Sequence, residues 1–224
     1  MPPLPPETKH STLIKICGLR STEAALAASN AGADYLGFNF VEGVRRQIQP
    51  DEAARIITDY LDQRNDRNQP GLVGLFLDQD PDFVNETSRR LGLDYLQLCG
   101  DEDADYFSKV ELPIFKMVRV KNGDTPADLD QMIAPFLDAG HGVLLDRYDK
   151  GTPGGSGKTF DWSIAQGIAS RNNVLLAGGL NPENVQSAIT QLSPWAVDVS
   201  SGVETDGTKD PDRIRAFIEA VQTA

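Results

Sequence analysis

Cysteine and histidine are scarce in this sequence, with only two of each in 224 residues. Two cysteines, Cys17 and Cys99, are too few for a disulfide scaffold, so we expect a protein of the reducing cytoplasm. His10 lies in a proline-rich N-terminal segment, and His141 lies in an Ala-Gly-His-Gly turn. This pair cannot supply a histidine-centred triad or a multi-histidine metal site, and we expect no metal and no cofactor.

Long apolar runs and an excess of basic residues are also missing. No stretch of 18 apolar residues occurs, and residues 1–12 carry four prolines in place of the apolar core of a signal peptide. We therefore expect no membrane partner and predict a flexible tail over residues 1–12. The 21 Lys+Arg face 33 Asp+Glu, a formal net charge of −12 at pH 7. Such a surface repels nucleic-acid phosphates, which makes a nucleic-acid partner a poor expectation.

What the sequence does contain is a regular alternation of two kinds of segment. Eight short apolar runs are separated by longer segments with helical spacing, a pattern typical of parallel strands covered by helices. The runs span residues 13–17, 35–38, 72–76, 95–98, 114–118, 142–146, 174–177 and 196–199. Eight strands alternating with about eight helices predict an α/β fold, a single (β/α)₈ TIM barrel over residues 13–224. An open doubly wound sheet is the alternative, although no Gly-x-Gly-x-x-Gly follows the first run.

Capping pairs mark several helix starts. A side-chain acceptor at the N-cap followed by proline at the first helical position favours a helix, because proline has no N–H to leave unsatisfied there. The pairs are Asp80-Pro81, Thr125-Pro126, Asn181-Pro182 and Asp210-Pro211. We predict that a helix begins at each of them.

Polar residues at the ends of the predicted strands are the candidates for chemistry, because barrels place their active sites there. They are Cys17, Asn39, Asp78, Gln97, Cys99, Arg119, Asp146 and Asp198. A thiolate can remove a proton from carbon and a carboxylic acid can donate one, so Cys17 and Asp146 form a candidate base and acid. Such a pair suits an isomerisation or elimination on a phosphorylated small molecule. A buried apolar thiol and a loop cap are the alternative roles of these two residues.

Two glycine-bearing turns indicate a phosphate site. Gly178-Gly179 follows the seventh run, and Ser200-Ser201-Gly202 follows the eighth. In phosphate-binding barrels the loops after these two strands hold the phosphate through backbone N–H groups. Residues 151–160 resemble a P-loop, but Thr152 stands where its first glycine should be. We interpret this segment as a mobile loop able to cover a substrate.

Taken together, these motifs resemble the phosphoribosylanthranilate isomerase family of tryptophan biosynthesis. The resemblance runs from about residue 13 to residue 217. The matching motifs are Lys15-Ile16-Cys17-Gly18, Gly32-Ala33-Asp34 with Gly37-Phe38, Leu144-Leu145-Asp146, Gly154-Gly155-Ser156-Gly157 with Phe160-Asp161-Trp162, Gly178-Gly179-Leu180-Asn181-Pro182 with Asn184-Val185, and Val197-Asp198 with Ser200-Ser201-Gly202-Val203-Glu204. Each motif is weak alone, but their combination and order are specific.

The resemblance implies an Amadori rearrangement of N-(5′-phosphoribosyl)anthranilate that needs no cofactor. Asp146 would then be the general acid that protonates the ribose ring oxygen, and Cys17 the general base that removes the C2′ proton. Arg46 would hold the anthranilate carboxylate, which suits a guanidinium fork. Asp198 would lie near the ribose hydroxyls, and the glycine-bearing turns would hold the 5′-phosphate. Gln97 is a further candidate for substrate contact.

Departures from the family pattern leave some assignments open. Glu42-Gly43-Val44 stands where members often have proline and serine, and Arg45 is a rival for the role of Arg46, which we prefer from its spacing to Pro50. Cys99 stands where the family commonly has histidine. A related phosphate-barrel enzyme (indole-glycerol-phosphate synthase or a pentose-phosphate epimerase) and a non-catalytic metabolite-binding barrel are the alternative functions, and both a monomer and a homodimer are open.

Overall fold

The computed structural model describes residues 12–65, 69–121, 123–147 and 160–224, and in it eight parallel strands close into a barrel. Each strand pairs with the next along the chain, and β8 returns to pair with β1. The strands are β1 (Leu13–Cys17), β2 (Tyr35–Asn39), β3 (Gly71–Phe76), β4 (Tyr95–Leu98), β5 (Ile114–Val120), β6 (Gly142–Arg147), β7 (Val174–Leu176) and β8 (Ala196–Val199). The predicted (β/α)₈ barrel is confirmed, and the open doubly wound sheet is wrong.

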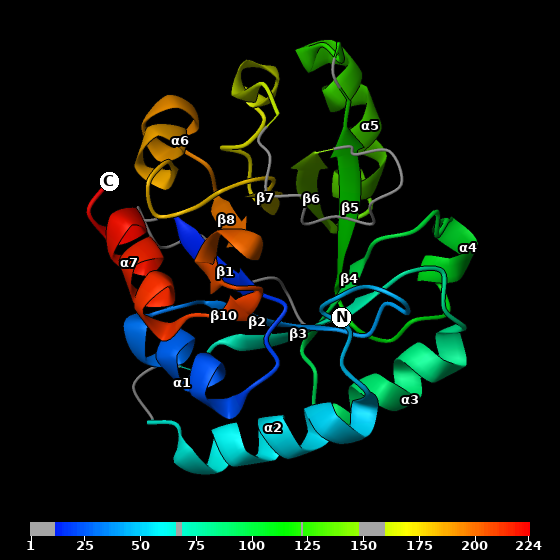
Figure 1. The fold of residues 1–224 in the computed structure, drawn as a ribbon. Helices are drawn as coiled ribbons and strands as arrows, with labels where there is room; N and C mark the ends of the chain where they lie inside the picture. The colour runs from blue at the N-terminus through cyan, green and yellow to red at the C-terminus, as the bar shows by residue number, and fades with distance from the viewer. Residues whose placement is uncertain (1–11, 66–68, 122, 148–159) are drawn as a thin grey trace.

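Helices surround the barrel, and the first helix packs beside the last, which closes the outer ring (Figure 1). They are α1 (Thr22–Ala31), α2 (Pro50–Gln63), α3 (Pro81–Leu91), α4 (Ala104–Phe107), α5 (Pro126–Asp138), α6 (Val185–Leu192) and α7 (Pro211–Gln222). After β8 the chain also forms a short 3₁₀ helix, η2 (Ser201–Val203), and a small hairpin of β9 (Glu204–Thr205) and β10 (Thr208–Lys209). This hairpin lies between the last strand of the barrel and the last helix.

Three of the four predicted helix starts are confirmed. Asp80, Thr125 and Asp210 are N-caps whose side chains accept backbone N–H groups of the first turn. At Asn181 the prediction is wrong, because α6 begins only at Val185. The Asn181 side chain does accept the N–H of Glu183, but the chain forms a turn there before the helix starts.

The expected eighth α-helix is also absent from the described part of the chain. The described residues between β6 and β7 contain a single 3₁₀ helix, η1 (Trp162–Ala165), followed by turns. Gly167 has a φ of +72°, a left-handed conformation that an α-helix cannot continue through. In residues 160–173, the described part of the connection between β6 and β7, turns and a 3₁₀ helix therefore stand where the other strands are followed by α-helices.

Alternation along each strand sorts the side chains into two layers. In β1, Ile14 and Ile16 face the helices and belong to the large outer core, whereas Leu13 and Cys17 face the barrel interior. Aromatic rings of Tyr35, Tyr95 and Phe115 pack against one another inside the barrel, with centroids 5.3 to 5.6 Å apart. These rings come from the amino-terminal ends of β2, β4 and β5, so they fill the end of the barrel opposite the candidate chemistry.

Two predictions fall on parts of the chain that the structure does not describe. The proposed flexible tail covers residues 1–12, of which only Thr12 is described, and the proposed covering loop spans residues 151–160, of which only Phe160 is described. Over the described residues, no helix combines the length and apolar character that crossing a membrane requires.

Candidate active site

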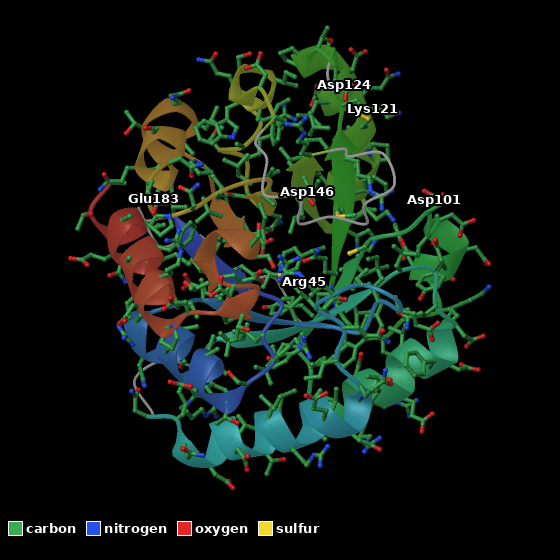
Figure 2. The ribbon with its side chains drawn as sticks, in the orientation of Figure 1. Arg45, Asp101, Lys121, Asp124, Asp146 and Glu183 are labelled. Atoms are coloured by element: carbon green, nitrogen blue, oxygen red, sulfur yellow. The ribbon has the colours of Figure 1, made fainter. Side chains whose placement is uncertain are left out.

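A cavity opens among the carboxyl-terminal ends of the barrel strands. Its polar lining consists of Cys17, Asn39, Arg46, Gln97, Cys99, Asp146, Asp198 and Ser200. Apolar side chains complete the wall, namely Val41, Val44, Leu75, Met117 and Leu144. In Figure 2, Asp146 and Arg45 lie toward the centre of the ring of helices, whereas Glu183 and Asp124 lie farther out.

Six of the eight polar residues predicted at strand ends line this cavity, and Asp78 and Arg119 do not. Asp78 adopts a left-handed φ of +51°, and its carboxylate accepts the backbone N–H of Asp101, so it organises the loop after β3. Arg119 donates to the carbonyl oxygen of Cys99 at 3.1 Å. Both residues support neighbouring loops.

Asp146 reaches the cavity because it follows Leu144 by two residues on β6, and alternate residues share a face. Its Oδ1 accepts the backbone N–H of Arg147 at 2.8 Å. Burial raises the pKa of this carboxyl to about 6, the Asp198 charge adds to the rise, and the Arg147 N–H, Arg119 and Lys15 oppose it. A carboxyl with such a pKa is partly protonated near neutral pH and can donate a proton.

This raised pKa predicts a pH-dependent cost in stability. A carboxyl whose pKa is higher in the folded state stabilises the fold fully below its unfolded pKa of 3.8, and that contribution is lost as the pH rises through about 6. Replacing Asp146→Asn removes the titration, so the stability of the variant relative to wild type should rise by about 2 kcal/mol from about pH 4.5 to pH 7.5. Urea unfolding at the two pH values measures this difference. A variant whose advantage is the same at both would show that Asp146 is not held in a neutralising environment.

Cys17 ends β1, is 5% exposed and faces the cavity. Burial raises the pKa of its thiol, while the charges of Lys15 and Lys209 act to lower it. A Cβ atom on Gly37 of β2 would lie 3.2 Å from the Cys17 sulfur, so glycine leaves the thiol its space. A buried thiol of raised pKa is a strong base once it has been ionised.

Lys15 is a functional candidate that stands in the sequence only as part of the Lys15-Ile16-Cys17-Gly18 motif. Its side chain is fully buried, and its ammonium donates to Asp198 Oδ1 at 2.7 Å and to Gln97 Oε1 at 2.8 Å. The available signal was a lysine at the alternating position of an apolar strand, two residues before Cys17. A lysine there must face the barrel interior, where an unpaired charge is costly.

Arg45 and Arg46 occupy different environments. Arg46 lines the cavity with a side chain that is 13% exposed, whereas the Arg45 side chain is 53% exposed and is not part of the cavity wall. Arg46 donates from Nε to Glu204 Oε1 at 2.6 Å and from Nη2 to Glu204 Oε2 at 3.1 Å. Of the two arginines, Arg46 is therefore the one that contributes to the cavity wall.

Glu204 is a second residue whose importance the sequence did not reveal. Although burial acts to raise its pKa, hydrogen bonds and charges from Arg46 and Lys209 outweigh it and lower the pKa to about 2. Arg45 also contacts this carboxylate. A second cavity shares Arg46, Glu204 and Lys209 with this cluster and is lined in addition by Gly18, Arg20, Ser21, Gly207 and Thr208. The cluster concentrates positive charge at the mouth of a strongly acidic protein.

The two predicted phosphate loops lie against each other. Gly178 and Gly179 have φ values of +84° and +70°, and a Cβ on Gly202 would come within 1.9 Å of the Leu180 carbonyl oxygen. Lys209 donates to the carbonyl oxygen of Ser200 at 2.8 Å. Among the predicted phosphate ligands (Gly178, Gly179, Ser200, Ser201 and Gly202), Ser200 lines the cavity described above. The other four lie in the same pair of touching loops at its edge.

Within the described ranges, no group of three or more His, Cys, Asp or Glu side chains is arranged to hold a metal ion.

Comparison with known proteins identifies one family. The sequence model described as N-(5′-phosphoribosyl)anthranilate (PRA) isomerase matches residues 14–220. Proteins named N-(5′-phosphoribosyl)anthranilate isomerase from Dehalococcoides mccartyi and Trichlorobacter lovleyi are 42% and 44% identical to this chain. The matches cover 94% of this chain in both cases, and 95% and 98% of the two relatives.

Solved structures give the same result. Phosphoribosyl anthranilate isomerase from Thermotoga maritima matches with a TM-score of 0.80 and 34% identity, covering 95% of this chain and 100% of that one. A phosphoribosyl anthranilate isomerase in complex with reduced 1-(o-carboxyphenylamino)-1-deoxyribulose 5-phosphate matches with a TM-score of 0.78 and 32% identity, at the same coverage.

Proposed function

Because this chain belongs to the N-(5′-phosphoribosyl)anthranilate isomerase family, we propose that it catalyses the Amadori rearrangement of N-(5′-phosphoribosyl)anthranilate in tryptophan biosynthesis. The product is 1-(2-carboxyphenylamino)-1-deoxyribulose 5-phosphate. Residues 13–224 form the catalytic barrel domain in this proposal, Asp146 is the general acid and Cys17 is the general base. The reaction moves protons within one molecule, so it calls for no external oxidant or reductant.

The observation that carries this proposal is the presence of a proton donor and a proton acceptor in one cavity. Cys17 comes from β1 and Asp146 from β6, and both line the same space. A carboxyl with a pKa of about 6 can be protonated when the substrate arrives, and a thiolate is basic enough to take a proton from carbon. A binding protein without catalytic activity has no need of this pair.

In the proposed mechanism, Asp146 protonates the ribose ring oxygen as the ring opens to a Schiff base. The nitrogen is then positively charged and acidifies the C2′ proton, which Cys17 removes to give an enolamine. Tautomerisation of the enolamine gives the ketone. Gly178 permits the loop after β7 to approach Asp146, since a Cβ atom there would lie only 3.3 Å from its Oδ1.

The remaining ligands hold the two charged ends of the substrate apart. Arg46 receives the anthranilate carboxylate. Glu204 accepts two of its five N–H donors, so three remain for the substrate. The backbones of Gly178-Gly179 and Ser200-Ser201-Gly202 receive the phosphate. Asp198 and Gln97 are buried residues of the cavity wall, and in this proposal they contact the ribose hydroxyls of the substrate.

The two arginines provide a matched pair of variants. Arg46→Ala should lower kcat/KM for N-(5′-phosphoribosyl)anthranilate roughly 10- to 100-fold, mainly through KM, because a hydrogen bond between charged groups contributes about 1.5–3 kcal/mol. Arg45→Ala, which also loses a contact to Glu204, should change it less than about threefold. Steady-state kinetics of both variants measure the difference. A larger loss of kcat/KM in Arg45→Ala than in Arg46→Ala would show that Arg45 binds the substrate carboxylate.

The proposed function itself is tested by identifying the product. Purified protein incubated with N-(5′-phosphoribosyl)anthranilate, with no cofactor added, should yield a compound of unchanged mass that co-elutes with authentic 1-(2-carboxyphenylamino)-1-deoxyribulose 5-phosphate. Ligand binding without that product would instead support a metabolite-binding barrel.

A further inference from the structure

Lys15 is a buried cation that the proposed mechanism does not use. It stands two residues before Cys17 on β1, so both side chains face the barrel interior, and no part of Lys15 is exposed to solvent. Burying an ammonium in this way is unfavourable unless its partners compensate. The partners of Lys15 therefore indicate what the charge does.

The ammonium of Lys15 lies between groups of the candidate site. It donates to Asp198 Oδ1 at 2.7 Å and to Gln97 Oε1 at 2.8 Å. Asp198 is the strand partner of Lys15 in the pairing of β1 with β8, so the backbone register itself aligns the two side chains. An ammonium has three N–H donors, of which Asp198 and Gln97 take two. Because Lys15 and Cys17 are alternate residues on one face of β1, the positive charge also acts on the Cys17 thiol and opposes the rise in its pKa.

Gln97 is held so that its oxygen faces Lys15. Its Nε2 approaches the Cys99 sulfur at 3.5 Å, which leaves Oε1 to accept the ammonium N–H. Gln97 is 3% exposed, so this orientation is fixed within the barrel. Hydrogen bonds to Gln97 of β4 and Asp198 of β8 therefore fix the position of the Lys15 ammonium. Both partners line the cavity that contains Cys17.

We propose that Lys15 is a positioning residue of the reaction, whose fixed positive charge stabilises the thiolate form of Cys17 and holds the Asp198 carboxylate toward the substrate. This inference rests on the proposed role of Cys17 as the base. Lys15 neither gives nor takes a proton. Burial acts to lower its pKa, but Asp198 and Cys17 outweigh burial and raise the pKa above the usual value, so it remains an ammonium throughout.

Other charged and titratable groups also face Cys17 and bear on its ionisation. Asp198 faces it from β8 and disfavours the thiolate, whereas Lys209 from β10 favours it. Cys99 interacts with it from beyond the end of β4, and Arg46 and Asp146 line the same cavity. Lys209 is also bonded to Glu204 and Ser200, whereas Lys15 shares its strand face with Cys17. Among these groups, Lys15 is the cation that we expect to have the largest effect.

The test is the rate at which iodoacetamide alkylates Cys17 as a function of pH, followed by peptide mass spectrometry, which separates Cys17 from Cys99. Lys15→Met should move the midpoint for Cys17 upward by about one pH unit or more, the effect expected for loss of an adjacent opposite charge. At pH near 7 the same variant should lose roughly tenfold or more in kcat/KM. An unchanged midpoint would overturn the proposal.

A second buried lysine provides the matched control. Lys116 lies on β5 and pairs with Glu102, away from the cavity lining. Lys116→Met removes a buried ammonium of the same type, yet it should leave the Cys17 midpoint where it is in wild type. An equal shift in both variants would show that Lys15 acts only through general loosening of the barrel, and would overturn the proposal.

Two further results separate this inference from the proposed function. If Lys15→Met does not fold, the variant Lys15→Met/Asp198→Asn removes both members of the buried pair, and its Cys17 midpoint is compared with that of Asp198→Asn alone. The same upward shift is expected, and its absence overturns the proposal. If the midpoint shifts in Lys15→Met but turnover does not fall, Cys17 is not the base, and the proposed catalytic role fails while the electrostatic effect stands.

Discussion

Asp146→Asn is expected to lower kcat for N-(5′-phosphoribosyl)anthranilate by roughly 100- to 10,000-fold, the usual contribution of a positioned general acid. The amide keeps the size of the side chain and can still accept the Arg147 N–H, but it has no proton to deliver to the ribose oxygen. KM should change little, because Arg46 and the phosphate loops are untouched. Stopped-flow or steady-state assays of the purified variant measure both constants.

The stability measurement described above serves as the control for this variant. An Asp146→Asn protein that is folded, is more stable than wild type at neutral pH and still binds substrate has lost only the proton donor. Turnover close to wild type in such a protein would remove Asp146 from the role of acid.

Cys17→Ala is expected to cause a second loss of the same order, because alanine leaves no group able to take the C2′ proton. Alanine is close to cysteine in size, so the small cavity it leaves should not unfold the barrel. The measurement is kcat, together with the circular dichroism of the variant to confirm that it is folded.

The other cysteine provides the comparison for Cys17→Ala. Cys99 lines the same cavity and is equally buried, and burial raises the pKa of its thiol to about 12. Cys99→Ala should therefore lose less than about tenfold, as expected for a neighbour that only helps to orient Gln97. Equal losses in the two alanine variants would show that neither thiol is the specific base.

The fold was accessible from the sequence because its signals are local. Eight apolar runs and the caps at Asp80, Thr125 and Asp210 each depend on a few neighbouring residues. The failures also have local causes. The side chain of Asn181 makes the expected capping bond, but the helix begins four residues later, at Val185. The sequence around Gly167 does not show whether this glycine adopts helical or left-handed φ, so the end of the helical pattern there could not be predicted.

The candidate site was less accessible, because its most informative contacts join distant residues. Lys15 and Asp198 are 183 positions apart, and Arg46 and Glu204 are 158 positions apart. Only closure of the barrel brings these pairs together. The spacing to Pro50 favoured Arg46 over Arg45, and Arg46 is the one that lines the cavity, but its contact with Glu204 depends on how the loop after β2 leaves the strand.

The acidic composition does not describe the local charge around the candidate site. A net charge of −12 argues against polyanionic partners, yet Arg20, Arg45, Arg46 and Lys209 gather at the mouth of the barrel. Local cations and backbone N–H groups can therefore attract a doubly anionic small molecule against the field of the whole protein.

The most direct test of the proposed reaction is the fluorescence of N-(5′-phosphoribosyl)anthranilate after addition of the purified protein without cofactor. With wild type the fluorescence should fall at a rate proportional to protein concentration. With Cys17→Ala or Asp146→Asn, the rate of fluorescence loss should be close to the rate in buffer alone. Loss of fluorescence at the buffer rate with folded wild-type protein would contradict the proposed isomerase activity.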